Sequence, residues 1–220
     1  MYKRQGQIKS LSADVFKTLS TDQIAGLSTS QIAVLTSAQA KSLTSAQLNG
    51  LTTAQLLAIS TSDIAAIEVA TLTKLNTVQI QALTSSQIKA LKVSQVQSLG
   101  TDQIAALTTK QVQQLNAEDI KALSTTQISK LSTSQVSALT GVQLSALTAS
   151  QLNAMDSASI PYVKVSSLKP LAFAGMNQTK LYQMFAITQS NKMSIDQWNM
   201  LGASKRTSLL PLFTNGRSLY

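Results

Sequence analysis

Leu or Ile recurs at every eighth residue from Leu11 to Leu147, without one insertion. A second apolar row lies five residues after the first, from Phe16 to Leu152, and only Ala40 in that row is small. Numbering each eight-residue unit, or octad, from its leading Leu places the two rows at positions one and six. The eighteen octads form one continuous repeat, and such a repeat predicts a solenoid.

A single long helix does not bury these two rows. Eight residues at 100° each overshoot two full helical turns by about 80°. The apolar stripe would therefore circle a long helix several times, and no face of that helix would stay apolar. Each octad must form a short element of its own.

The polar positions of the octad carry a helix-start signal. Position two is Ser or Thr in thirteen octads, and position five is Gln in fourteen. Ser/Thr-x-x-Gln is the capping box, in which the hydroxyl and the Gln side chain each accept from a backbone N–H at the helix start. Eleven octads hold a complete box. The structural capping pairs that we single out are Ser20/Gln23, Ser28/Gln31, Thr36/Gln39, Thr84/Gln87 and Thr148/Gln151.

The sequence thus predicts an all-α solenoid of very short helices, one per octad, each opened by a capping box. Such a short helix is not stable alone in water, so stability must come from stacking on neighbours. The alternative is a β-solenoid whose Thr-rich face would predict ice binding. It is disfavoured because residues 1–154 contain five Gly and no Pro for the many corners of such a coil.

The character of the chain changes after residue 154. The octad phase continues in weaker form to residue 202, with apolar residues such as Leu171, Ile195 and Met200 in the two rows. All three Pro and seven of the nine aromatic residues lie beyond residue 154. We predict a non-native or disordered leader, a regular array, a C-terminal cap of six degenerate octads and an irregular tail, over residues 1–10, 11–154, 155–202 and 203–220. A separate small C-terminal domain is the alternative to the cap.

Composition argues against most catalytic chemistry. The sequence has no Cys and no His, which removes thiol nucleophiles, imidazole bases and the usual zinc ligands. The acidic residues are scattered, with Glu118-Asp119 as the only adjacent pair, and no glycine-rich phosphate loop is present. We expect no enzymatic activity, no catalytic or metal-binding residue and no cofactor.

The net charge of +9 is spread unevenly. Residues 155–220 carry seven basic and two acidic residues, which is typical of a solvated surface, so nucleic acid is not the expected partner. No run of 18 apolar residues predicts a membrane span. Aromatic and basic residues near the C-terminus form a candidate partner surface for an unknown partner, such as another segment of a larger parent protein: Tyr182, Trp198, Lys205 and Arg206.

Tandem Leu-Thr/Ser-x-x-Gln-Ile/Val/Leu octads resemble the repeat tracts of very large bacterial surface or secreted proteins, including adhesin-like ones. The resemblance covers residues 11–154 well and 155–202 weakly. It implies a rigid spacer or scaffold at the cell surface or outside the cell. The start, MYKRQ, resembles the translation of a sequencing adaptor, which implies a metagenomic fragment of a longer reading frame.

Two functional interpretations follow. In the first, the array is a non-enzymatic structural scaffold whose surface positions drift. In the second, the variable positions four and seven bind a peptide, a glycan or nucleic acid. Position seven holds Lys17, Ala25, Asn49 and Leu57 in different octads, with no shared chemistry, which favours the scaffold.

Overall fold

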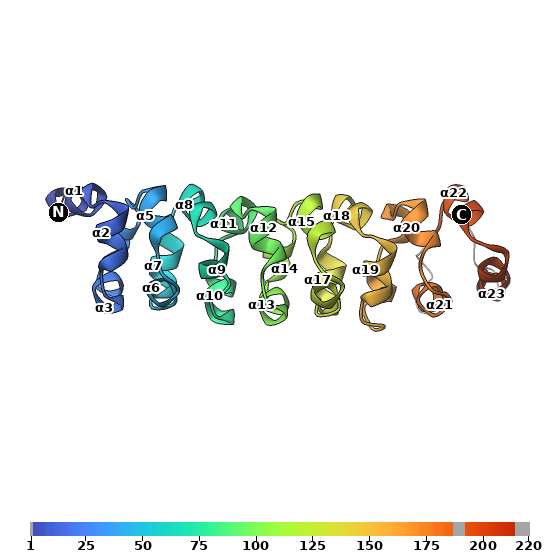
Figure 1. Cartoon of the computed structure of the whole chain (residues 1–220). Coiled ribbons are helices and arrows are strands. Elements are labelled where there is room, and N and C mark those ends of the chain that lie inside the picture. The colour runs from blue at the N-terminus through green and yellow to red at the C-terminus, as the bar shows by residue number, and fades with distance from the viewer. Residues whose placement is uncertain (1, 187–191, 214–220) are drawn as a thin grey trace. The chain divides into compact units, whose positions relative to one another are not determined.

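The computed structural model describes residues 2–186 and 192–213 of the chain. Helices are the only regular elements in these ranges (Figure 1). The predicted all-α solenoid is confirmed, and the β-solenoid alternative is wrong. The chain divides into two compact units, unit 1 (Met1–Gln114) and unit 2 (Leu115–Tyr220), which are described separately.

Unit 1 consists of short α-helices, most of them four to six residues long. Their bounds are α1 Tyr2–Ser10, α2 Ala13–Thr18, α3 Thr21–Ala25, α4 Thr29–Ile32, α5 Ser37–Ser42, α6 Ser45–Asn49, α7 Thr53–Ala58, α8 Thr61–Ala66, α9 Val69–Leu72, α10 Thr77–Ala82, α11 Ser85–Ala90, α12 Val93–Gln97, α13 Thr101–Ala106 and α14 Thr109–Val112.

Unit 2 begins with helices of the same kind and then changes to 3-10 helices and longer α-helices. Their bounds are α15 Ala117–Ala122, α16 Thr125–Ile128, α17 Thr133–Ala138, α18 Gly141–Ala146, α19 Ala149–Ala154, η1 Ile160–Tyr162, η2 Val165–Ser167, α20 Pro170–Ala174, α21 Gln178–Ala186, α22 Ile195–Met200 and α23 Ala203–Phe213.

Helix α5 shows how the octad sets both ends of a helix. The backbone N–H of Gln39 donates to Thr36 Oγ1 at 3.2 Å, and the N–H of Thr36 donates to Gln39 Oε1 at 2.9 Å. These two bonds satisfy N–H groups that have no partner inside the helix. At the other end, Leu43 leaves the helical conformation with ψ of 130°, and Thr44 follows as the cap of α6. The position-one Leu therefore ends one helix and leads into the next.

The two apolar rows build the core of each unit. Position-six side chains from Phe16 to Leu152 are at most 1% exposed. Position-one side chains from Leu35 to Leu147 are at most 6% exposed. Burying each Leu or Ile contributes about 1.5–3 kcal/mol, which offsets the backbone entropy lost in ordering the octad. The core is thus a continuous ladder of aliphatic side chains.

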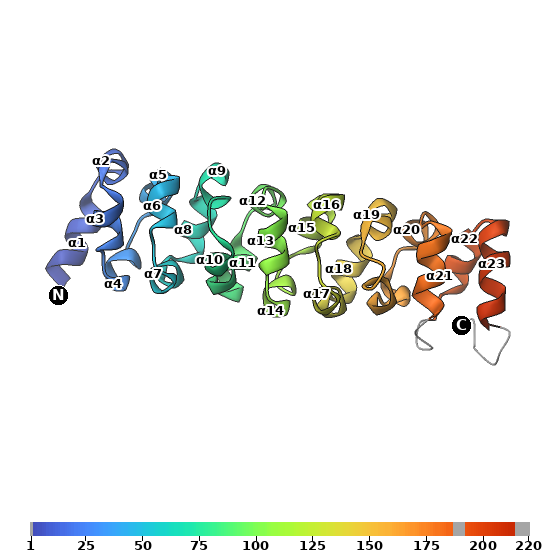
Figure 2. The same ribbon diagram turned by 90° about the horizontal axis from the view of Figure 1, so that it is seen from below.

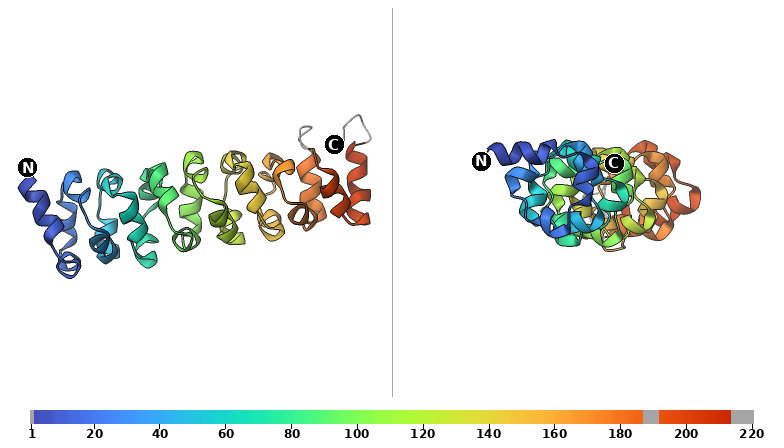
Figure 3. Two further views of the ribbon diagram at one scale, coloured as in Figure 1. Left: turned by 90° about the horizontal axis from the view of Figure 1, so that it is seen from above. Right: turned by 60° about the vertical axis from the view of Figure 1, so that its left-hand side comes forward.

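Within each unit, the helices of the regular octads pack against helices three places away in the chain. In unit 1, α2 contacts α5, and α5 contacts α8, so these helices lie side by side (Figure 1 and Figure 2). In unit 2, α15 contacts α18, and α16 contacts α19. Short helices thus stack on sequence-distant partners in each unit (Figure 3).

The Gln at position five joins the stacked helices. Its Oε1 accepts from the cap of its own helix, and its Nε2 donates to backbone carbonyls of earlier octads. Gln87 Nε2 donates to the carbonyls of Leu56 and Ile59, both at 2.8 Å. Gln151 does the same to Ile120 and Leu123 in unit 2. These bonds span 31 and 28 residues, so each Gln reaches the end of the fourth helix before its own, at the corner that leads into the third helix before it.

The first ten residues differ from the predicted leader. Residues 2–10 form helix α1, so the expectation of disorder is wrong there, and Met1 lies outside the described residues. Gln39 Nε2 donates to the carbonyls of Ile8 and Leu11, at 2.7 and 2.9 Å. The end of this segment is therefore part of the stack. Whether it is native stays a prediction.

The octad phase does not continue to residue 202 as predicted. Leu171, Ile195 and Met200 are 73%, 60% and 48% exposed, although the continued phase would place them in the core. Leu168, which the continued phase places at position six, and Met193 are buried directly before a helix cap, where position-one residues lie in the regular octads. The 3-10 helices η1 and η2 break the eight-residue spacing, and the helices after them restart in a new register.

The predicted domain boundaries also differ from the structure. The division into compact units falls between Gln114 and Leu115, inside the regular array, and not at residue 154. The tail predicted as irregular contains helix α23, Ala203–Phe213, while residues 214–220 lie outside the described range. The octad sequence pattern weakens after residue 154, but helix α20 still packs against α19.

The double role of the position-five Gln predicts unequal effects of one substitution at two sites. Gln87→Ala removes the Gln donor to the buried carbonyl of Ile59 and one of two donors to that of Leu56, which keeps the N–H of Ile59. We expect the free energy of unfolding to fall by about 2–4 kcal/mol. Gln23→Ala removes only a cap at an exposed helix, and we expect a loss of about 0.5–2 kcal/mol. Urea unfolding followed by circular dichroism measures both. Equal losses would contradict the bridging role of Gln87.

Asp119 occupies position five without a donor, which predicts an unusual pH dependence. Asp119 is 1% exposed, its Oδ2 accepts from Asn116 N at 2.8 Å, and no described residue donates to its Oδ1. Burial raises the pKa of this carboxyl above 3.8. Between the unfolded and the raised folded pKa the folded chain binds more protons, so its stability falls as the pH rises through this window.

We therefore expect Asp119→Asn to raise the free energy of unfolding at pH 7 by about 1–3 kcal/mol and to remove that pH dependence. The exposed Asp102 is the control, because Asp102→Asn should change the value by no more than about 0.5 kcal/mol. Chemical denaturation between pH 3 and pH 7 tests the pair. A destabilised Asp119→Asn variant at pH 7 would be inconsistent with a buried, donor-poor carboxylate.

Candidate functional site

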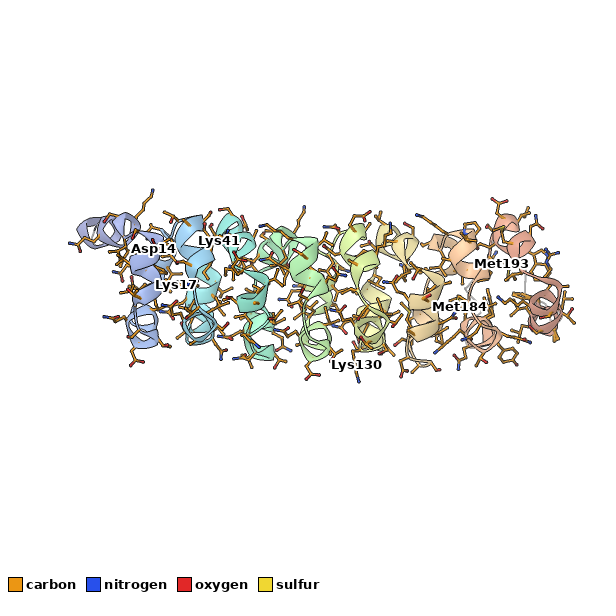
Figure 4. All side chains as sticks on the ribbon, in the orientation of Figure 1. Asp14, Lys17, Lys41, Lys130, Met184 and Met193 are labelled. Atoms are coloured by element: carbon orange, nitrogen blue, oxygen red, sulfur yellow. The ribbon has the colours of Figure 1, made fainter. Side chains whose placement is uncertain are left out.

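Outward-facing positions of the octad are the first place to look for a site. Lys17 and Lys41 at position seven of unit 1 are exposed, as is Lys130 at position eight in unit 2 (Figure 4). Lys41 forms an ion pair with Glu68 at 3.5 Å, and both side chains are more than half exposed. Such surface pairs contribute little to stability. This pair is therefore a solvated surface contact and does not mark a site.

All five capping pairs singled out from the sequence make both bonds of the capping box. They fall into two groups by burial. Gln39, Gln87 and Gln151 are buried and also bridge to earlier octads. Gln23 and Gln31, near the N-terminus, are exposed or half-buried and make only the cap. Gln recurs at these positions because it caps the start of its helix and, where it is buried, also joins stacked helices.

The predicted partner surface in unit 2 is largely occupied by internal contacts. Lys205 Nζ donates to the carbonyl of Ala174 at 2.5 Å. Arg206 donates from Nε to the carbonyl of Leu201 and from Nη2 to that of Asn199, at 2.9 and 2.6 Å. Its guanidinium lies over the Trp198 ring, 6.0 Å from the centroid. These two cations and Trp198 fasten the last described helices.

Tyr182 is placed differently from the other three residues of that surface. It is 48% exposed and lies on α21 in a shallow hollow with Thr179 and Ser208. Met184, on the same helix, and Met193 are buried (Figure 4). Arg206 and Trp198 are thus in contact with each other. Tyr182 lies apart from them, in an uncharged hollow with hydroxyl side chains.

Two lysines in unit 2 take the place of the position-five Gln. Lys180 Nζ donates to the carbonyl of Met155 at 2.6 Å and to Ser157 Oγ at 3.0 Å, and Lys205 bonds the carbonyl of Ala174. Desolvation by burial is the main cause that lowers the pKa of Lys180 below 10.5. Sequence reasoning missed these roles because the register shifts. The signal was Asn177, which caps Lys180 N at 2.8 Å three residues earlier.

Each unit has a groove of moderate size. The groove of unit 2 has a volume of about 480 Å³ and is lined by residues of α15, α18, α19 and α20, including Glu118, Lys121, Lys169 and Leu171. The groove of unit 1 has about 520 Å³ and is lined by Lys41, Glu68 and Lys92 among others. Both combine small side chains with a few charges of mixed sign, and neither gathers groups that act together in acid–base chemistry.

Within the described ranges, no group of three or more His, Cys, Asp or Glu is placed to hold a metal ion. No helix among the described residues has both the length and the apolar character needed to cross a membrane. The two adjacent carboxylates lie in different surroundings, because Glu118 is exposed while Asp119 is buried beside the helix cap Asn116. A structural role for Asp119 follows from its bond to Asn116.

Comparison with known proteins gives one family. The ALTTAQ repeat model matches residues 5–37, 56–93, 88–117 and 115–149. These matches cover more than half of the chain and, apart from residues 5–10, lie within the segment in which each octad forms one helix. No curated protein matches the sequence. On the strength of the repeat, the chain belongs to the ALTTAQ repeat family.

Proposed function

We propose that the chain is a non-enzymatic scaffold or spacer, and that it forms part of a larger bacterial surface or secreted protein. The observation that carries the proposal is the use of the recurring residues. Leu at position one and the apolar residue at position six are buried, and both ends of the Gln at position five bond to the backbone. The recurring residues at positions one, five and six thus all contribute to the stacking of the helices.

The outward positions support the same role. At position seven, Ala33, Lys89 and Ser129 occupy equivalent sites in different octads and share no chemistry. A surface selected to bind one ligand tends to gather related side chains. A scaffold requires only that these positions be soluble. The location outside the cell and the adhesin-like context rest on the resemblance of the octads alone.

A binding module is the alternative, and the groove of unit 2 is the observation that favours it. Leu171 is 73% exposed at this groove, and Lys121 and Lys169 flank it. A peptide with an apolar and an acidic residue would suit this lining. The groove occupies one place in unit 2, so it would account for one local interaction and not for the repeat.

A rigid spacer predicts a narrow distance distribution within unit 1. The chain has no Cys, so Ala33→Cys and Gln81→Cys can carry two spin labels at exposed position-seven sites. We expect pulsed electron resonance to give one narrow peak. Inserting a further octad, LTSSQIKA, between Ala58 and Ile59 should move the peak to a longer distance and keep it narrow, because stacking is retained.

The control insertion is the half octad LTSS at the same place. It shifts the octads after it by half a repeat, so buried positions no longer meet their partners and the Gln bridges are lost. We therefore expect a lower melting temperature and a broad peak. A broad peak in the unmodified chain, or equal damage from the two insertions, would rule out a rigid octad scaffold.

The scaffold also predicts tolerance at outward lysines. Lys89 and Lys121 are exposed at position seven. We expect the double variant Lys89→Ala/Lys121→Ala to change the free energy of unfolding by less than about 0.5 kcal/mol. Thermal unfolding measures stability, and binding to peptide and glycan arrays measures recognition. An array ligand that binds the native chain and is lost in the variant would favour the binding module.

A further inference from the structure

The grooves of the two units are built from equivalent positions of the repeat. The groove of unit 1 is lined by α5, the end of α8, the start of α9 and α12, and that of unit 2 by α15, α18, α19 and α20. Lys41 and Lys121 both lie at position seven, and their octads are ten octads apart. Lys92 and Lys169 are the N-cap residues of α12 and α20. Each groove therefore has one position-seven lysine and one cap lysine.

The groove of unit 1 contains a carboxylate for its position-seven lysine. Lys41 Nζ lies 3.5 Å from Glu68 Oε1. Glu68 is the N-cap residue of α9, where most octads have Ser or Thr, and its side chain makes no cap hydrogen bond. The carboxylate is thus directed to the lysine and not to the start of its own helix. This ion pair shows that an acidic group fits beside a position-seven lysine in such a groove.

The groove of unit 2 has no such carboxylate. The residue equivalent to Glu68 is Thr148, whose hydroxyl accepts from the N–H of Gln151 as the cap of α19. Lys121 and Lys169 are exposed, and neither ammonium group has a hydrogen bond or an ion pair with a described residue. Among the described residues that line this groove, Glu118 is the only acidic one. The groove thus has two cations, one carboxylate and a free place beside Lys121.

An aliphatic side chain lies in the groove of unit 2 together with the two lysines. Leu171 is 73% exposed, although helix α20 packs against α19 on one side and against α22 on the other. Leu171 is the second residue of α20, and the second residue of α12 in the groove of unit 1 is Ser94. The small side chains of Ala146 and Ala149 line the groove beside it. The groove of unit 2 therefore offers an apolar contact that the groove of unit 1 lacks.

We propose that the groove of unit 2 binds an acidic peptide segment of a partner protein. One carboxylate of the peptide pairs with Lys121, in the place that Glu68 occupies in unit 1, and a second pairs with Lys169. An apolar side chain between the two packs on Leu171. The inference rests on the alternative of a binding module, which it deepens by naming the ligand class, and it gives the scaffold one docking place.

A peptide fits this groove better than nucleic acid does. Single-stranded nucleic acid is usually held by aromatic side chains on which its bases stack, together with a basic track along its backbone. The residues that line the groove include no aromatic side chain, and the volume of about 480 Å³ suits a few residues of an extended chain. Two lysines and one leucine match two carboxylates and one aliphatic side chain.

The test uses the full chain and an array of heptapeptides in which two Glu flank one Leu, separated from it by zero to two Ser on each side. The strongest binder, labelled with fluorescein, is then titrated with the chain, and fluorescence anisotropy measures the dissociation constant. The ligand controls are the same peptide with Gln in place of Glu and a seven-nucleotide oligo-dT. We expect both controls to bind at least about tenfold more weakly than the acidic peptide.

Lys121→Ala/Lys169→Ala is the decisive variant. The matched control is Lys130→Ala/Lys164→Ala, which changes two exposed lysines of the same unit that do not line the groove. We expect the acidic peptide to bind the native chain and the control equally, and the decisive variant at least about tenfold more weakly. Thermal unfolding of both variants should match that of the native chain, because all four lysines are exposed.

A gain of binding in unit 1 tests the equivalence of the two grooves. Glu68→Thr/Ser94→Leu removes the carboxylate beside Lys41 and adds the leucine. We expect this variant to bind two acidic peptides per chain, whereas the native chain binds one. Titration calorimetry measures the stoichiometry.

Four results would overturn the proposal: no binding by any acidic heptapeptide, equal binding by the Lys121→Ala/Lys169→Ala variant, equal binding of oligo-dT, or one peptide per chain in the unit 1 variant. None of them bears on the proposed spacer role. That role depends on the distances between labels at residues 33 and 81 within unit 1, which are measured without a peptide.

Discussion

The amide of the position-five Gln is the interaction on which the fold depends. An octad alone forms one short helix, whose first N–H groups and last carbonyls lack partners. Gln Oε1 satisfies the start of its own helix, and Gln Nε2 satisfies carbonyls near the end of a helix about one superhelical turn earlier. One side chain thereby couples local helix initiation to long-range stacking. An apolar residue at this position would remove the partner of the cap N–H and a donor to the earlier carbonyls.

The exceptions at position five follow from the same requirement. Thr71 keeps a donor, and its hydroxyl donates to the carbonyl of Leu43, 28 residues earlier. Asp63 has no donor, and Ser37 and Ser60 donate to its carboxylate instead. Lysines take over in the irregular part of unit 2. Most residues at position five thus share a hydrogen-bond donor that points to the carbonyls of earlier octads, although their side chains differ in shape.

Local features of the fold could be predicted from the sequence, because they are set by residues within one octad. The capping box at Thr84 and Gln87 needs only a spacing of three, and the rows of Leu83 and Ile88 need only the repeat. The second bond of Gln87 could not be predicted, since its acceptors depend on how many octads complete a turn. That number is set by the angle at each Leu corner, which the residue types do not encode.

Residues of the candidate partner surface show the same dependence on partners elsewhere in the chain. The cluster of aromatic and basic residues at Trp198, Lys205 and Arg206 predicts a partner surface, yet Lys205 also donates to a carbonyl 31 residues earlier, and Arg206 donates to the carbonyls of Asn199 and Leu201. Position-five Gln side chains cover the carbonyls at helix ends inside the regular array, and Lys side chains take over this role where the octad register changes. A basic residue that follows a break in the octad phase is therefore interpreted first as a substitute for Gln and only then as a contact for a partner.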